Sequence, residues 1–150
     1  MSVVALVTWI ITVSAGLFLL AIWLIEYDHD FQHSAATRLP IPVISAHALL
    51  ALTGLAVWIG YLVLDSDRLA WTAAVIVVTG ATLGLIMAAR WIGVYRTFGR
   101  RPRAGQAHLR TVQPVPPERN FPLPVVVAHG AFALATVTLV VLTAIGVGGS

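Results

Sequence analysis

Pro42-Val43-Ile44-Ser45-Ala46-His47-Ala48-Leu49-Leu50-Ala51 opens an apolar segment that carries a histidine. A second copy follows as Pro124-Val125-Val126-Val127-Ala128-His129-Gly130-Ala131-Phe132-Ala133. In both copies the histidine comes five residues after the proline, with alanine before it and a small residue after it. Proline in the first turn of a helix removes no hydrogen bond and presets φ, so each stretch is expected to begin a helix. The sequence therefore predicts two imidazoles, those of His47 and His129, at the same depth in two helices.

Composition places these helices in a membrane. Of the 150 residues, 59% are hydrophobic and only 10% are charged, which is typical of an integral membrane protein. Four apolar runs, residues 3–25, 42–64, 69–94 and 122–147, each reach the about 20 residues that a helix needs to cross about 30 Å of hydrocarbon. We therefore predict an all-α membrane protein, a four-transmembrane-helix bundle that forms one transmembrane domain over residues 1–150.

The chain also contains an internal repeat of two helices. Residues of the first run recur in the third at a displacement of 68, in the pairs Gly16 and Gly84, Trp23 and Trp91, and Tyr27 and Tyr95. The two histidines are displaced by 82, so the 14 additional residues must lie in the second repeat's inter-helix loop, where an insertion costs least. The predicted repeats are residues 1–64 and 69–150.

Loop charges predict the topology. Residues 95–121 hold six arginines against a single acidic residue, Glu118. The positive-inside rule places this loop in the cytoplasm of a cell-membrane protein. Counting the spans from it places residues 26–41 in the cytoplasm as well and both termini outside. The second and fourth helices then run parallel, which brings both histidines to about 7–8 Å inside the cytoplasmic end.

The arginines predict a lipid partner. The cluster from Arg96 to Arg103 is expected to bind anionic lipid headgroups of the bilayer. We expect no nucleic-acid binding, because that requires a basic folded surface. In the first loop, Asp28, His29, Asp30 and His33 could form a metal cluster, but such a loop is more often a solvated face, and the second repeat has no match to it.

Small side chains surround the two histidines in the expected bundle. The chain has no cysteine, so any metal or cofactor must be held mainly by histidine. The residues four and seven positions after each histidine share its helix face and are small, and the repeated glycines lie on the other two helices. Together these residues would leave a slot lined by Gly16, Ala51, Gly54, Gly84, Ala133 and Thr136. A flat slot between two opposed neutral imidazoles suits a bis-histidine haem b, in which each Nε2 gives a lone pair to iron.

This arrangement resembles the four-helix core of membrane cytochromes b. In that family the ligands lie on the second and fourth helices, and glycines on the first and third make room for haem. The chain differs in having one histidine on each ligand helix instead of two, so the resemblance implies a single haem near the cytoplasmic side, with His47 and His129 as metal ligands. It also implies electron transfer, with membrane quinone as a partner. Arg90 would then neutralise a haem propionate or extend to the lipid headgroups.

Other interpretations of the histidines stay open at this point. A histidine in a membrane helix can act as an interhelical hydrogen-bonding residue, in which case the chain would be a non-catalytic accessory or scaffold subunit of a larger membrane complex. Another metal, a quinone or a proton-transfer role are further alternatives. A catalytic triad is excluded, because no span contains a carboxylate. The tryptophans near the helix ends are interpreted as anchors in the aromatic belts of the membrane.

Overall fold

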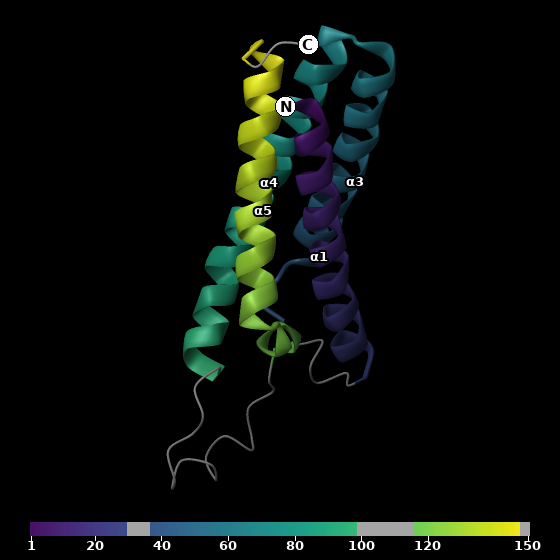
Figure 1. Cartoon of the computed structure of the whole chain (residues 1–150). Coiled ribbons are helices and arrows are strands. Elements are labelled where there is room, and N and C mark those ends of the chain that lie inside the picture. Colours follow the sequence, from purple (N-terminus) through teal and green to yellow (C-terminus); the bar gives the residue numbers. More distant parts are fainter. Residues whose placement is uncertain (30–36, 99–115, 148–150) are drawn as a thin grey trace, which may run out of the picture.

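A computed structural model describes residues 1–29, 37–98 and 116–147 of the chain (Figure 1). These residues form four long helices and one short 3-10 helix, with no strand among them. The elements are α1 (Ser2–His29), α3 (Ile41–Leu64), α4 (Asp67–Phe98), η1 (Pro117–Asn120) and α5 (Leu123–Ala144). All four long helices are long and apolar enough to cross a membrane. The predicted fold class, a bundle of four membrane-spanning helices, is confirmed.

The prolines begin the two histidine helices as expected. Pro40 and Pro122 are the N-cap residues of α3 and α5, and a second proline lies within the first turn of each helix. His47 and His129 are both six residues from the start of their helices, or about 9 Å along the axis at about 1.5 Å per residue. The two imidazoles therefore leave their helices at the same height.

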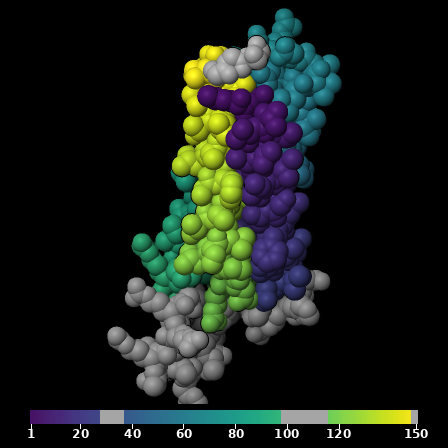
Figure 2. All heavy atoms as spheres, in the orientation of Figure 1, coloured from purple at the N-terminus to yellow at the C-terminus, as the bar shows by residue number. Residues whose placement is uncertain are grey.

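The helices form two closely packed pairs. α3 packs most extensively against α4, and α1 packs most extensively against α5, while contacts between the two pairs are sparser. Figure 2 shows α5 lying directly beside α1 along most of its length. α3 and α5 are diagonal to each other, with no Cα atoms within 8 Å, and so are α1 and α4. The histidines therefore approach each other across the centre of the bundle.

The start of α1, the end of α5 and the α3–α4 turn lie at one end of the bundle (Figure 1). That turn is tight, because only two residues separate the helices and Asp65 adopts a left-handed conformation with φ 47°. The ends of α1 and α4 and the starts of α3 and α5 lie at the opposite end, which we call the loop end.

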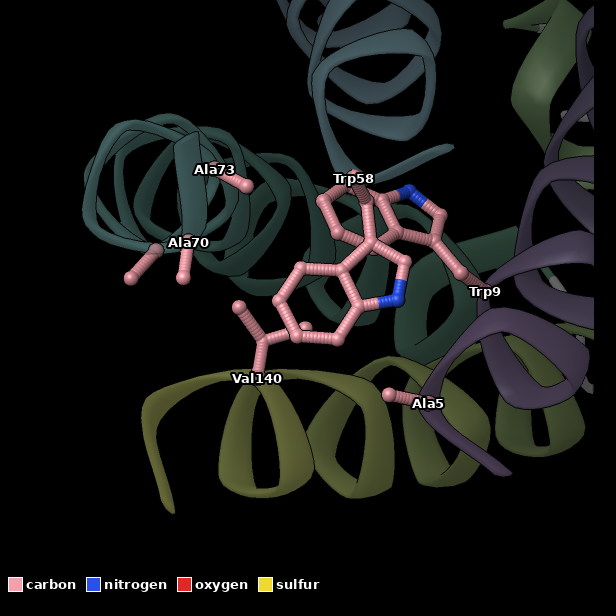
Figure 3. Packing of buried hydrophobic residues seen from close by; sticks show 7 residues of the cluster. Ala5, Trp9, Trp58, Ala70, Ala73 and Val140 are labelled. Atoms are coloured by element: carbon pink, nitrogen blue, oxygen red, sulfur yellow. The ribbon is translucent and has the colours of Figure 1, made fainter. Parts of the chain in front are cut away.

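A tryptophan cluster fills the bundle at the end opposite the loop end. Trp9 and Trp58 are almost completely buried, and their ring centroids lie 6.4 Å apart (Figure 3). The Trp9 indole donates a hydrogen bond to the Ala51 carbonyl at 3.2 Å, and the Trp58 indole donates one to the Ser2 carbonyl at the same distance. Both bonds join α1 to α3.

The aromatic-belt interpretation is therefore wrong for four of the five tryptophans. Trp9, Trp58, Trp23 and Trp91 are all buried, whereas Trp71 is half exposed. An indole can be buried among helices where its N–H finds an acceptor, and each of these four does. Large apolar side chains cover the outer surface instead, as a hydrocarbon environment requires.

Candidate cofactor site

Each histidine is held by a backbone carbonyl of a neighbouring helix. His47 extends from α3 to α4, where its Nδ1 lies 2.8 Å from the Gly80 carbonyl oxygen. His129 extends from α5 to α1, where its Nδ1 lies 2.9 Å from the Thr12 carbonyl oxygen. Thr12 and Gly80 are separated by 68 residues, which is the displacement of the sequence repeat. The two histidines therefore make equivalent contacts in the two halves.

The repeated glycines lie against the imidazoles. A Cβ added to Gly84 would be 2.9 Å from His47 Cε1, and a Cβ added to Gly16 would be 3.0 Å from His129 Cε1. In a helix each Cα–Cβ bond tilts toward the N-terminus and covers the preceding turn. Because Gly16 and Gly84 come four residues after Thr12 and Gly80, they leave those carbonyls open to the rings. Gly84 and Gly16 thus allow the His47 and His129 rings to reach these carbonyls.

The carbonyl contacts determine which ring nitrogen is available. A carbonyl oxygen only accepts hydrogen bonds, so Nδ1 of each neutral imidazole must carry the proton and donate. Each Nε2 then keeps its lone pair, and neither has a hydrogen-bond partner in the part of the chain that the structure describes. A metal-binding histidine nearly always donates its other ring N–H to a carbonyl, carboxylate or water, which fixes the tautomer and raises the basicity of the ligand.

The two imidazoles face one another closely. Their ring centroids are 6.2 Å apart and their planes are inclined by 73°. Among the described residues no hydrogen bond joins the two rings, and each ring is bonded to a backbone carbonyl of another helix, α4 for His47 and α1 for His129. Both rings are partly exposed to a shared space in the bundle.

That space is a cavity of about 180 Å³ lined by all four long helices. Its wall is mostly apolar, and besides the two histidines it includes five of the predicted site residues: Gly16, Ala51, Gly84, Ala133 and Thr136. Thr136 is almost fully buried, and its hydroxyl donates to Phe132 O at 2.8 Å and lies 3.0 Å from the hydroxyl of Thr8. Seven of the nine predicted site residues thus surround one cavity.

Gly54 and Arg90 lie outside this cavity. A Cβ on Gly54 would be 2.7 Å from Cζ2 of Trp9, so this glycine accommodates an indole and does not thin the cavity wall. Arg90 is exposed and donates from Nη1 to the carbonyl of Arg38 at 3.1 Å, at a separate surface groove. Arg90 comes six residues after Gly84, about 9 Å further toward the loop end. Arg90 therefore lies closer to the loop end than Gly84 and the His47 ring that Gly84 contacts.

The loop end of the cavity is closed by residues that the sequence did not single out as a site. The walls there include Trp23, Leu39, Trp91 and Phe121. The Trp91 indole donates to the backbone carbonyl of Glu118 at 3.1 Å, and the Trp23 indole donates to the hydroxyl of Thr37 at 3.3 Å. The sequence repeats Trp23 as Trp91, 68 residues later. This repetition does not show whether the two indoles are buried in the bundle or lie at the membrane interface.

Glu118 completes this closure. Its side chain is fully buried, and its two oxygens bind the backbone N–H of Arg38 at 2.7 Å and the Thr37 hydroxyl at 3.0 Å. Residues 37 and 118 lie in different inter-helix segments, so Glu118 joins the segments before α3 and before α5.

Two predicted loop features fall partly outside the described residues. The acidic first-loop cluster includes Asp30 and His33, and the arginine cluster includes residues 100–103; neither has a described arrangement. Within residues 1–29, 37–98 and 116–147, no group of three or more histidine, cysteine or acidic side chains could hold a metal ion. The histidine pair is therefore the candidate site.

Comparison with known proteins adds no assignment, because no family model, curated protein or solved structure matches the chain.

Proposed function

We propose that the protein binds one b-type haem between His47 and His129 and acts in electron transfer within the membrane. The observation that supports this most is the 6.2 Å separation of two imidazoles whose Nδ1 atoms are both bound to carbonyls. Two metal–nitrogen bonds of about 2.0–2.1 Å, with about 1.1 Å from each nitrogen to its ring centre, would place two coaxial imidazole centres about 6.3 Å apart. The observed separation of the ring centres leaves room for one metal ion between rings that face each other through Nε2.

Haem fits the donor set better than a bare metal ion. A zinc site needs three or four protein ligands, whereas a haem iron needs only two axial ones because the macrocycle supplies the rest. The described residues offer two imidazoles and no third ligand. The sparse packing between the α1/α5 and α3/α4 pairs is also consistent with a flat group between them.

The protein's own residues would hold and protect such a group. When bound, haem supplies one-electron redox chemistry. The Thr12 and Gly80 carbonyls would hold the two rings and leave each Nε2 lone pair available to the iron, and the mostly apolar wall would exclude water. We infer a membrane quinone as the partner, because a site enclosed by membrane-spanning helices is most accessible to a lipid-soluble redox carrier. The loop arginines favour a position on the cytoplasmic side.

A scaffold role is the second candidate, and one observation favours it. The His47 and His129 bonds to backbone carbonyls already join neighbouring helices without any cofactor. Such bonds stabilise a membrane bundle by about 0.6–2 kcal/mol each. In that case the chain would serve as an accessory subunit of a larger membrane complex.

An absorption spectrum of the detergent-purified protein before and after dithionite distinguishes the two functions. With bound haem, either His→Ala change removes an axial ligand and should abolish most of the low-spin spectrum, and His→Gln should be equally damaging. With a structural histidine, Gln should be tolerated much better than Ala, because its amide can also donate to the carbonyl. Leu49→Ala is the matched control, since Leu49 lies on the exposed face of α3.

A colourless preparation that stays colourless after haem is added would overturn the haem proposal. Circular dichroism should show the same helix content for every variant, because membrane insertion depends on the apolar spans.

A further inference from the structure

A second cavity lies on the surface at the loop end, between the start of α3 and the last turns of α4. Its volume is about 640 Å³, and it is lined by Thr37, Arg38, Leu39, Pro40, Ile41, Ala89, Arg90 and Gly93. We call it the arginine groove. It shares only Leu39 with the histidine cavity, and Leu39 is buried between the two.

Two cations, Arg38 and Arg90, line this groove. Arg90 is fixed by its Nη1 bond to the Arg38 carbonyl. Its other N–H groups form no hydrogen bond with a described residue, and they can donate to a ligand. The described lining contains no carboxylate, and neither arginine forms an ion pair with a described residue. The nearby Glu118 is not available, because its carboxylate is fully buried and bound to Thr37 and to the Arg38 backbone.

The remaining lining is apolar and open. Ile41 is half exposed, Ala89 is exposed, and a Cβ added to Gly93 would meet nothing within 4 Å. Small residues on α4 therefore leave room beside the guanidinium groups. A cationic rim above an apolar floor, at the end of membrane-spanning helices, matches the junction between the headgroup and the acyl chains of a lipid.

We propose that the arginine groove binds the phosphate of one anionic phospholipid, with Arg90 and Arg38 as the phosphate ligands. Arginine presents several N–H donors in a planar fork that matches phosphate oxygens, and such charge-assisted bonds are stronger than neutral ones. The acyl chains then lie along Ala89 and Ile41. This site involves residues outside the haem proposal and does not depend on it.

Native mass spectrometry of the full chain in detergent, titrated with phosphatidylglycerol or phosphatidylcholine, tests the site. We expect one tightly bound phosphatidylglycerol and much weaker phosphatidylcholine binding. Arg90→Gln should lower phosphatidylglycerol affinity at least about tenfold, as expected for the loss of charged hydrogen bonds. Gly93→Leu should cause a similar loss by filling the groove without changing any charge.

Two variants serve as matched controls. Arg119→Gln removes an exposed arginine in η1, at the same end of the bundle but outside the groove and outside the Arg96–Arg103 cluster, and Gly130→Leu adds a leucine at another helical glycine with nothing within 4 Å. Both should bind phosphatidylglycerol like the original chain. Equal losses in Arg90→Gln and Arg119→Gln would indicate diffuse electrostatics and overturn the proposal.

Competition identifies the source of the phosphate. Inorganic phosphate at millimolar concentration should not displace the bound lipid, because it lacks the apolar contacts. Displacement would overturn the lipid assignment in favour of a soluble phosphate ligand. The dithionite difference spectrum of the same samples should be unchanged in Gly93→Leu, because Gly93 lines the groove and not the histidine cavity, so a failure of this site and a failure of haem binding are separately visible.

Discussion

At the scale of single residues, the site depends on the absence of a side chain at Gly16 and Gly84. The His47 and His129 rings reach helix carbonyls only because Gly84 and Gly16 have no side chain over those carbonyls. The sequence predicted that both glycines and both histidines belong to one site. It did not predict that each glycine contacts a histidine, because a sequence repeat relates equivalent positions and gives no direction of approach between helices.

Substitution of alanine for Gly16 or Gly84 should therefore displace the histidine ring that contacts it. Gly84→Ala and Gly16→Ala place a Cβ at 2.9 and 3.0 Å from an imidazole carbon, so the ring must move and its carbonyl bond weakens. Alanine is otherwise about 1 kcal/mol more favourable than glycine inside a helix. We expect lower haem occupancy in the visible spectrum for both variants.

Gly93→Ala and Gly130→Ala are the controls, because a Cβ at either position meets nothing within 4 Å. They should keep full haem occupancy and an equal or higher thermal midpoint in detergent. A spectrum of Gly84→Ala indistinguishable from that of Gly93→Ala would contradict the assigned contact.

At the scale of elements, hydrophobic length predicted the four helices, and the connections between them decide how the site is closed. The predicted run of residues 42–64 became Ile41–Leu64, and residues 69–94 became Asp67–Phe98. The closure by Glu118 and Thr37 was not predictable, because a single carboxylate in an arginine-rich loop is typical of a solvated position. Its burial follows from the pairing of two segments 81 residues apart, which no local pattern encodes.

Glu118→Ala should loosen this closure. The change leaves the Arg38 N–H and the Thr37 hydroxyl without their acceptor, and a buried polar group that loses its partner costs about 1–3 kcal/mol. We expect a lower thermal midpoint in detergent and faster proteolysis within η1. Glu118→Gln keeps one oxygen acceptor and should be intermediate. If Glu118→Ala unfolds like the original protein, the carboxylate does not hold the two segments together.

At the scale of the whole molecule, the predicted repeat explains why the site lies on the axis of the bundle. Equivalent contacts of His47 with Gly80 and of His129 with Thr12 relate α3 and α4 to α5 and α1. The division into repeats 1–64 and 69–150 stays a prediction, as does its superposition about an axis along the membrane normal. Gly54 and Arg90 do not line the cavity as predicted, because spacing along one helix does not show which side chains a neighbouring helix contributes. The Trp9 ring fills the space beside Gly54, and Arg90 donates to the Arg38 carbonyl.

Membrane orientation decides which compartment the histidine cavity is nearest to, and the absence of cysteine from the chain makes it measurable. Single cysteines at Ser66, in the α3–α4 turn, and at Asn120, in η1, mark opposite ends of the bundle. Because the arginines favour a cytoplasmic loop end, a membrane-impermeant maleimide should label Ser66→Cys in intact cells and Asn120→Cys only after permeabilisation. Leu49→Cys, on the exposed apolar face, should resist the reagent in both cases, since the reactive thiolate does not form in hydrocarbon. The reverse pattern at residues 66 and 120 would place the histidine cavity in the outer half of the membrane, and any electron donor or acceptor would then have to be sought on that side.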